Sequence, residues 1–174
     1  MNRSSPSKNI VLIGMPGSGK STIGVLLAKT LGRKFIDTDI RIQEVTGRLL
    51  QEILDKDGIG AFLEIEEETI LALDRHHAVI ATGGSVVYSR RAMEHLRQQG
   101  IVVYLQVSSE VMERRLKNIT TRGLVLHPGQ DLRDLYDERL PLYEKYADIT
   151  INCTDDPIEH GVEKIAGGLK QYRA

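Results

Sequence analysis

The stretch VLIGMPGSGKST, residues 11–22, constrains the fold of this chain more than any other part of the sequence. Gly14, four further residues and then Gly19-Lys20-Ser21 match the Walker A pattern, between an apolar run and an amphipathic helical pattern. Glycines let the backbone curl so that successive N–H groups point inward, and the helix that begins near Lys20 adds the positive end of its dipole. The pattern therefore predicts a strand, a phosphate-binding loop and a helix.

We expect this loop to bind a nucleoside triphosphate. Lys20 would reach the β- and γ-phosphates, and the hydroxyl of Ser21 would ligate Mg²⁺. The loop residues expected to hold the nucleotide are Gly14, Pro16, Gly17, Ser18, Gly19, Lys20, Ser21 and Thr22.

Short apolar runs rich in β-branched residues alternate with longer helical patterns along the chain. Their two-sided hydrophobicity suits strands of a parallel sheet that is covered by helices on both faces. The expected strands are 9–13, 33–37, 77–82, 101–107 and 148–152. The expected helices are 20–31, 38–57 with a break at Gly47, 58–74, 89–98, 109–117, 131–146 and 156–170. This alternation predicts a three-layer α/β domain.

The chain of 174 residues is most simply a single domain, residues 9–174, after a flexible tail over residues 1–8. The segment TTRGLVLHPGQ, residues 120–130, is the longest piece without periodicity. It is either a plain connector or a mobile lid, which we place at about residues 118–130.

The charge balance and the single cysteine limit the possible partners and setting. A net charge of −1 argues against a broad surface for nucleic acid or for an anionic membrane, although it allows a local basic pocket. No apolar run is long enough to span a membrane. Because Cys153 is the only cysteine, no internal disulfide is possible. We therefore expect a cytoplasmic protein, and a monomer.

Two aspartates follow the second expected strand, in the order Asp37, Thr38, Asp39. Asp37 suits the magnesium shell, and Asp39 faces the next site along. Alternatively, Asp37 or Thr38 simply caps a helix that begins at Asp39. Capping and catalysis can coexist, and we favour a functional role.

Three further features lie where a second substrate could bind. Gly83 and Gly84 follow the third strand, where small residues let a substrate approach the backbone, although a tight turn explains them equally well. Arg122 lies in the possible lid, and Arg139 precedes Pro141 in a helical pattern. Either arginine could be a solvated surface charge, but phosphoryl transfer requires cationic groups over the developing negative charge.

Taken together, these motifs resemble those of shikimate kinases, which are small P-loop kinases with the nucleoside-monophosphate-kinase fold. The resemblance spans nearly the whole chain and rests on GMPGSGKST, FIDTD, TGG, the arginines at 114–115, TTRG and ERLPLYEKYAD. It implies a five-stranded parallel sheet in the order 2-3-1-4-5, flanked by helices, with a mobile lid. It also implies an acceptor-binding helical region at about residues 38–65, and ATP-dependent conversion of shikimate to shikimate 3-phosphate in aromatic amino acid biosynthesis.

The resemblance also implies roles for individual residues. Asp37 would hold Mg²⁺ with Ser21, and Asp39 would hydrogen-bond the acceptor hydroxyl or act as its base. Arg122 would swing over the phosphates, so the implied catalytic residues are Lys20, Asp39 and Arg122. Arg115 and the loop around Pro157 would flank the adenine. The implied acceptor-binding positions are Asp39, Leu63, Gly83, Gly84 and Arg139.

This chain departs from the family pattern at three positions. Ser85 stands where the family has a third glycine, and Gly123 follows the lid arginine where the family usually has proline. Leu63 follows Phe62 where the family has an arginine that grips the carboxylate and a ring hydroxyl of shikimate. Losing a charge-assisted contact of this kind typically costs ~1.5–3 kcal/mol.

Three functions are compatible with these residues. The first is a shikimate kinase in which Arg139, with Lys145 or another lid residue, compensates for Leu63. The second is a kinase of the same build that acts on another small acceptor, such as a less polar acid or a polyol. The third is a nucleotide-dependent sensor that no longer turns over. We favour the first, because one lost contact weighs less than a match along the whole chain.

The stretch FLEIEEE, residues 62–68, places four glutamates in five positions. Phe62, Ile65, Thr69 and Leu73 fall at helical spacing on one face, and most of the glutamates lie off it. We expect the glutamates to form the solvated face of a helix.

Overall fold

One parallel sheet of five strands organises the protein. The computed structural model describes residues 8–117, 123–154 and 157–173. The strands are β1 (Asn9–Ile13), β2 (Lys34–Asp37), β3 (Ala78–Ala81), β4 (Gly100–Gln106) and β5 (Ile149–Asn152). Their order in the sheet is β2-β3-β1-β4-β5, and all four pairings are parallel. The predicted fold class and strand order are confirmed.

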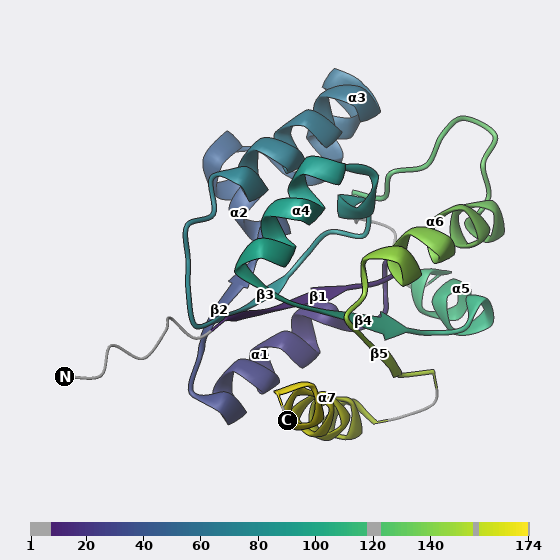
Figure 1. Ribbon diagram of the computed structural model, residues 1–174. Helices are drawn as coiled ribbons and strands as arrows, with labels where there is room; N and C mark the ends of the chain where they lie inside the picture. The colour runs from purple at the N-terminus through teal and green to yellow at the C-terminus, as the bar shows by residue number, and fades with distance from the viewer. Residues whose placement is uncertain (1–7, 118–122, 155–156, 174) are drawn as a thin grey trace.

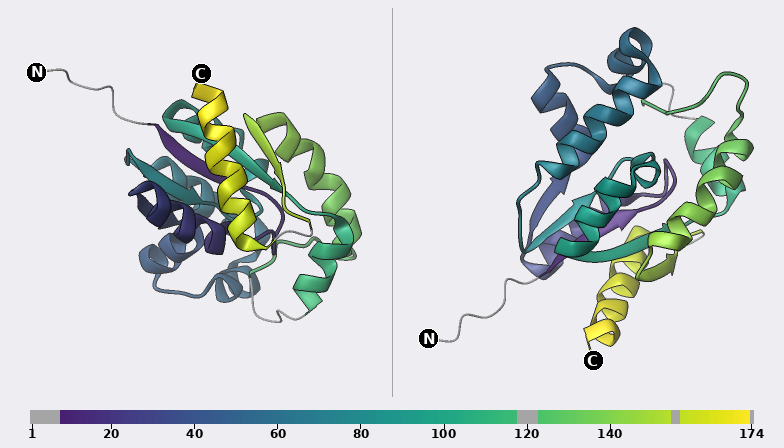
Figure 2. Two further views of the ribbon diagram at one scale, coloured as in Figure 1. Left: turned by 90° about the horizontal axis from the view of Figure 1, so that it is seen from below. Right: turned by 45° about the horizontal axis from the view of Figure 1, so that its top comes forward.

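Helices cover both faces of this sheet, which makes three layers. The helices are α1 (Lys20–Leu31), α2 (Thr38–Thr46), α3 (Leu50–Leu71), α4 (Arg90–Gln99), α5 (Ser109–Lys117), α6 (Leu132–Tyr146), α7 (Ile158–Arg173) and the short 3₁₀ helix η1 (Val86–Tyr88). Helices α1 and α7 lie together on one face, and α4 and α6 lie on the other (Figure 1). The view from below in Figure 2 shows α7 running across the underside of the sheet.

Glycines mark the breaks between the helices that follow β2. Gly47 ends α2 in the left-handed region with φ 66°, and Gly58 interrupts α3 with φ 84° and ψ 174°. Both breaks were predicted. Helix α3 ends at Leu71, three residues earlier than the predicted boundary, which is the usual precision of such boundaries.

The core consists of a large cluster around the sheet and a small one above the strand ends. All of β1 and β3 is buried, as expected for strands covered on both faces. The small cluster contains Ile42 of α2, Ile53 and Phe62 of α3, and Val125. Burying side chains of this size contributes about 1.5–3 kcal/mol each. The small cluster therefore holds the two helices after β2 against the segment that follows α5.

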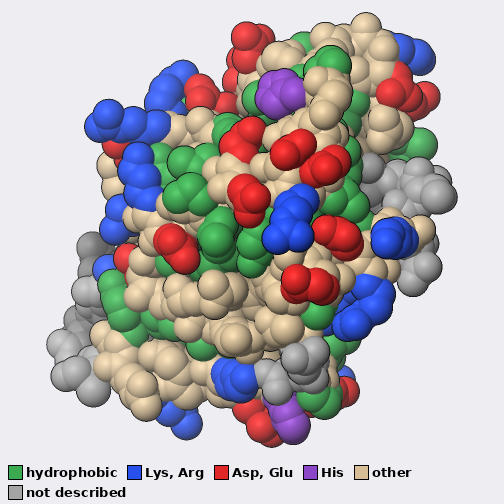
Figure 3. Space-filling model, turned by 90° about the vertical axis from the view of Figure 1, so that its right-hand side faces the viewer, with side chains coloured by type: hydrophobic (Ala, Val, Ile, Leu, Met, Phe, Trp, Pro, Cys, Tyr) green, Lys and Arg blue, Asp and Glu red, His purple; other side chains and the backbone are tan. Residues whose placement is uncertain are grey.

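Only part of the predicted lid and tail can be compared with the structure. Residues 1–7 and 118–122 lie outside the described residues. Residues 123–130 contain no helix or strand, and Val125 within them is buried. Among the described residues, no helix combines the length and the apolar character needed to cross a membrane. On the side that carries α5 and α6, acidic and basic side chains are interspersed (Figure 3).

Candidate active site

The carboxyl ends of three neighbouring strands bring the predicted site residues together. The loop after β1 carries the Walker A residues, β2 ends at Asp37, and β3 runs into the Thr82-Gly83-Gly84 turn. Between these segments lies a cavity of about 340 Å³. It is lined by Pro16, Gly17, Gly19, Lys20, Ser21, Thr22, Asp39, Thr82, Gly83, Gly84, Ser85, Leu116, Lys117, Gly123, Leu124, Val125, Leu132 and Arg139. In an open parallel sheet this edge is where ligands bind.

The loop after β1 has the geometry of a phosphate cradle. Gly17 and Gly19 have positive φ angles of 76° and 93°, which side chains tolerate poorly. A Cβ atom on Gly14 would stand 2.6 Å from the carbonyl oxygen of Leu105, so only glycine fits there. No side chain caps the start of α1, so its first N–H groups face the loop. A nucleotide phosphate fits this arrangement.

Lys20 is held at the base of the cradle by backbone carbonyls. Its Nζ donates to the carbonyl oxygens of Gly14 and Met15, both at 2.8 Å, and the side chain is buried. The ammonium group therefore lies inside the loop, where it can meet phosphate oxygens.

Asp37 joins the phosphate loop to helix α2. Its Oδ2 accepts a hydrogen bond from Ser21 Oγ at 2.6 Å, and its Oδ1 accepts from the backbone N–H groups of Asp39 and Ile40. Asp37 thus caps α2 and also contacts Ser21, so capping leaves one carboxylate oxygen facing the phosphate loop; its role toward Mg²⁺ stays a prediction.

The Ser21–Asp37 pair fits Mg²⁺ that arrives with a nucleotide. Mg²⁺ is usually held by one or two protein oxygens together with phosphates and water. Among the described residues, no group of three or more His, Cys, Asp or Glu could hold a metal. One hydroxyl and one carboxylate beside a phosphate cradle are compatible with Mg²⁺ bound in this way.

The glycine turn after β3 brings two carboxyl groups close to the backbone. A Cβ atom on Gly83 would collide with Oε1 of Glu66 and would stand 2.9 Å from Oδ1 of Asp39. The backbone N–H of Gly83 donates to Thr38 Oγ1 at 3.1 Å, which ties the turn to the start of α2. Gly83 is therefore required for space, and it brings the backbone to the acidic wall of the cavity.

Arg139 supplies the positive charge on the opposite wall. It is only 1% exposed, and its Nη2 donates to the carbonyl oxygen of Val125 at 2.8 Å. Its Nε donates to Tyr88 Oη at 3.0 Å, and the guanidinium carbon lies 5.0 Å from the centre of that ring. A Cβ atom on Gly84 would stand 3.0 Å from Nη1, so this turn leaves room for the guanidinium. These contacts fix the guanidinium where it can bind an anionic group.

Glu66 corrects the expectation that the glutamates of α3 form a solvated face. Glu64 and Glu68 are exposed, as expected, but Glu66 is 2% exposed and points to the glycine turn. Ser85 Oγ donates to its Oε2 at 2.7 Å, and its Oε1 has no hydrogen-bond partner among the described residues. The sequence did contain a signal, because position 66 lies four residues after Phe62 and three before Thr69, on the buried face.

Burial raises the pKa of Glu66 to about 7; the hydrogen bond from Ser85 acts in the opposite direction, and the charge of Asp39 acts in the same direction as burial. The carboxyl group of Glu66 therefore lies beside that of Asp39, directly behind the part of the cavity wall that Asp39 and Gly83 form.

Replacing Glu66 by glutamine should change how stability depends on pH. A glutamate in the unfolded chain ionises near pH 4.3, about three units below the buried side chain, so the folded protein holds an extra proton between these values. The free energy of unfolding of the wild type should therefore fall by roughly 3 kcal/mol as the pH rises from 4 to 8, relative to that of Glu66→Gln. Urea unfolding at a series of pH values measures this difference. Glu64→Gln, at an exposed site on the same helix, should follow the wild type; parallel curves for wild type and Glu66→Gln would contradict the assignment.

Seven predicted site residues are not among those that line the cavity: Gly14 and Ser18 of the phosphate loop, Asp37 at the end of β2, and Arg115, Pro157, Leu63 and Arg122. Arg115 is half-buried, and its Nη1 donates to the carbonyl oxygen of Gly17 at 3.0 Å, so it supports the phosphate loop from outside. Pro157 is exposed just before α7. Leu63 is half-buried and packs against the small cluster that contains Val125. Arg122 lies outside the described residues.

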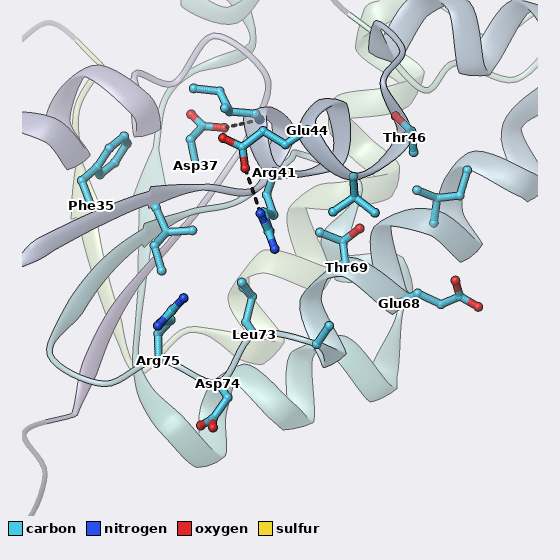
Figure 4. Close-up of a pocket in the computed structure, with 15 residues that line it drawn as sticks. Phe35, Asp37, Arg41, Glu44, Thr46, Glu68, Thr69, Leu73, Asp74 and Arg75 are labelled. Carbon is cyan, nitrogen blue, oxygen red and sulfur yellow. Dashed lines mark hydrogen bonds and ion pairs between the residues drawn. The ribbon is translucent and has the colours of Figure 1, made fainter.

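A second, larger hollow of about 820 Å³ lies at the β2 edge of the sheet. Figure 4 shows Arg41 paired with Glu44 along it and Asp74 and Arg75 at its far end. Apart from Asp37, none of the predicted site residues lines it. Among the described residues, none of the buried polar atoms that lack a partner belongs to its lining, so we do not assign the chemistry to this hollow.

Comparison with known proteins agrees with this geometry. The family model for shikimate kinase matches residues 16–170. A shikimate kinase of Thermodesulfovibrio yellowstonii is 42% identical over 168 residues, with 95% of both chains covered. One of Mycobacterium avium is 45% identical over 145 residues, with 82% of each chain covered. The solved structure of a shikimate kinase from Acinetobacter baumannii in complex with shikimate has a TM-score of 0.85 and 36% identity, and the match covers 95% of this chain and 94% of that one.

Proposed function

This chain belongs to the shikimate kinase family, and we propose that it transfers the γ-phosphoryl group of ATP to a hydroxyl group of shikimate. The observation that carries the proposal is the single cavity with a phosphate cradle at one end and a buried, anchored Arg139 at the other. A small acid with hydroxyl groups fits such a cavity, because its carboxylate can meet the guanidinium while a hydroxyl faces the phosphates.

The proposed reaction forms one bond and breaks one. The acceptor oxygen bonds to the γ-phosphorus as the bond from that phosphorus to the bridging oxygen of ADP breaks, and the hydroxyl proton passes to Asp39. Lys20 stabilises the negative charge that develops on the phosphate oxygens. We further propose that Arg122 assists Lys20.

Magnesium, oligomeric state and location are part of the same proposal. Ser21 and Asp37 would hold Mg²⁺, which when bound neutralises phosphate charge. We propose a monomer that acts in the cytoplasm, a setting that suits a chain whose only cysteine is the buried Cys153.

Leu63 favours one alternative, a kinase of the same build with a different acceptor. Its side chain packs against the cluster that includes Val125, and the carbonyl of Val125 is the one that anchors Arg139. The position therefore adjoins the cavity wall but contributes no charge to it. An acceptor that needs only one cationic contact, such as a less polar acid or a polyol, would suit this wall. A sensor domain without turnover is disfavoured because the cradle, Asp37 and Asp39 are all in place.

A coupled assay of ADP release tests the proposal. With ATP, Mg²⁺ and millimolar acceptor, shikimate should stimulate ADP release, whereas quinate, gluconate and nucleoside monophosphates should stimulate it far less. If shikimate has no effect and another acceptor does, the alternative is correct. If none of these acceptors stimulates ADP release, and ATP still binds, a nucleotide-dependent sensor without turnover is the better explanation.

Leu63→Arg sharpens the same test. If the protein acts on shikimate, an added guanidinium beside the acceptor cavity should lower the KM for shikimate by about tenfold. Leu63→Met keeps the volume and adds no charge, so it should leave the KM close to that of the wild type. Loss of activity on the true acceptor in Leu63→Arg alone would indicate that the pocket needs an apolar side chain there.

A further inference from the structure

We propose that Ser85 is a positioning residue for acceptor binding: its hydroxyl fixes the carboxyl group of Glu66 so that Oε1 faces the acceptor. The inference rests on the proposed function only in taking the cavity beside the phosphate loop as the place where the acceptor binds. The role proposed for Ser85 depends on its side chain, because the backbone conformation at position 85 does not require a serine.

The local backbone does not explain a serine at this position. Ser85 has φ −84° and ψ −9°, an ordinary right-handed conformation that almost any residue adopts. It precedes η1, but its side chain makes no capping hydrogen bond there. Its hydroxyl donates instead to Glu66 Oε2 at 2.7 Å, across 19 positions of sequence, and both residues are buried. The hydroxyl therefore serves the carboxyl group.

The two carboxyl oxygens of Glu66 differ in their hydrogen bonding. Its Oε2 accepts from Ser85, while its Oε1 is buried and makes no hydrogen bond within the part of the chain that the structure describes. A desolvated oxygen without a partner is costly, so a native protein retains one where a ligand completes the bond. Oε1 lies against the Cα of Gly83, at the point that Asp39 Oδ1 also approaches. Gly83, Asp39 and Ser85 line the cavity, whereas Glu66 lies directly behind them, so Oε1 adjoins the cavity wall at Gly83. In the proposal, an acceptor oxygen bound at this wall completes the hydrogen bond of Oε1.

The charged groups around Glu66 come from three different helices. Asp39 of α2 disfavours its ionised form, while Arg139 of α6 and Lys20 of α1 favour it. On its own helix, position 63 is a leucine and supplies no cation. The carboxyl group is thus oriented by a neutral hydroxyl rather than by an ion pair in the described structure. Without that hydroxyl, the terminal torsion of glutamate has broad, nearly two-fold freedom, and Oε1 would lose its fixed direction.

A neutral donor also determines what Glu66 can offer to the acceptor. When protonated, Oε1 can donate a hydrogen bond to an acceptor oxygen, and when ionised it can only accept one from a hydroxyl. Since burial raises the pKa of Glu66 to about 7, both forms occur near neutral pH. The hydrogen bond from Ser85 lowers this pKa, so removing the hydroxyl should raise it further.

Ser85→Ala tests the inference by steady-state kinetics. It should raise the KM for the acceptor by about five- to tenfold, leave the KM for ATP unchanged, and change kcat much less than the KM. Ser85→Thr keeps the hydroxyl and should restore most of the loss, while Ser85→Gly should match Ser85→Ala. Far-UV circular dichroism and thermal unfolding establish that each variant is folded.

The matched control is a second serine–glutamate pair outside the cavity. Ser89 Oγ donates to Glu67 Oε2 at 2.5 Å, one residue further along α3 and four residues further along the turn. Ser89 Oγ also accepts from the backbone N–H of Ala92 and so caps α4; Ser89→Ala therefore removes a serine–glutamate bond together with a helix cap. Although this is the more disruptive change, it should leave both KM values unchanged, because Ser89 does not line the cavity. An equal rise in KM for Ser85→Ala and Ser89→Ala would mean that the effect is structural, which overturns the inference.

A spectroscopic titration decides the matter without relying on turnover. In protein labelled with ¹³C at the glutamate carboxyl, the Glu66 resonance, assigned by its absence in Glu66→Gln, should titrate at higher pH in Ser85→Ala than in the wild type. Ser85→Thr should titrate close to the wild type. An unchanged titration in Ser85→Ala refutes the inference whatever the acceptor is, whereas absent turnover of shikimate by the wild type refutes only the proposed function.

Discussion

Replacing Lys20 by alanine is expected to reduce kcat by roughly 10³-fold or more. The ammonium group is buried inside the phosphate loop, where two carbonyl oxygens at 2.8 Å hold it. A cation placed in advance and shielded from water stabilises developing negative charge far better than a solvated one. The ADP-release assay with saturating ATP and acceptor measures the loss.

The matched control for this prediction is Lys29→Ala. Lys29 lies in the last turn of the same helix and is exposed, so its removal should leave the kinetics unchanged. The loss of two hydrogen bonds could also loosen the loop, so thermal unfolding of Lys20→Ala should be compared with that of the control. Turnover that continues at more than a tenth of the wild-type rate in a folded Lys20→Ala protein would mean that the active site lies elsewhere.

Asp39→Asn is expected to lower kcat by about 10²- to 10⁴-fold, with much smaller changes in either KM. The side chain lines the cavity two residues after the cap of α2, and its Oδ1 faces the glycine turn. An amide of the same size can still hydrogen-bond the acceptor, but it cannot take the proton that the hydroxyl must lose. The substitution should therefore lower kcat and leave the KM for the acceptor nearly unchanged.

Glu44→Gln, at an exposed position on the same helix, is the control for this second change and should behave as the wild type. If Asp39→Asn raises the KM for the acceptor and leaves kcat unchanged, Asp39 only positions the acceptor, and its role as a base is wrong.

The helices, the strands and the three-layer α/β class could be predicted from local patterns, whereas the strand order was implied by the family resemblance. Strands buried on both faces read as unbroken apolar runs, and glycines such as Gly47 mark the places where helices must end. The Walker A residues were equally readable, because the sequence of the loop dictates its own backbone. The observed boundaries of helices and strands differ from the predicted ones by only a few residues. Helix ends depend on capping contacts that a short stretch of sequence does not reveal.

The acceptor side of the site was harder to predict, because it depends on contacts between distant segments. Glu66 was grouped with its acidic neighbours on a solvated face, and its burial follows from the packing of α3 against a turn formed 19 residues later. Leu63 was assigned to the acceptor pocket by family resemblance; its side chain packs against the small cluster that contains Val125, a residue that lines the cavity, and its role in the pocket stays a prediction. Helical periodicity locates a face, but it does not tell which part of that face meets a cavity.

The two oxygens of Asp37 connect nucleotide and acceptor thermodynamically. Oδ2 belongs to the network of Ser21, and Oδ1 holds the first turn of α2, the turn that carries Asp39. A ligand that engages Ser21 therefore acts on the same carboxylate that orients the acceptor side. If bound nucleotide raises the affinity for the acceptor, thermodynamic linkage requires that bound acceptor raise the affinity for the nucleotide by the same factor. One side chain is thus shared by the two half-sites, and any coupling free energy that it carries is the same in both directions.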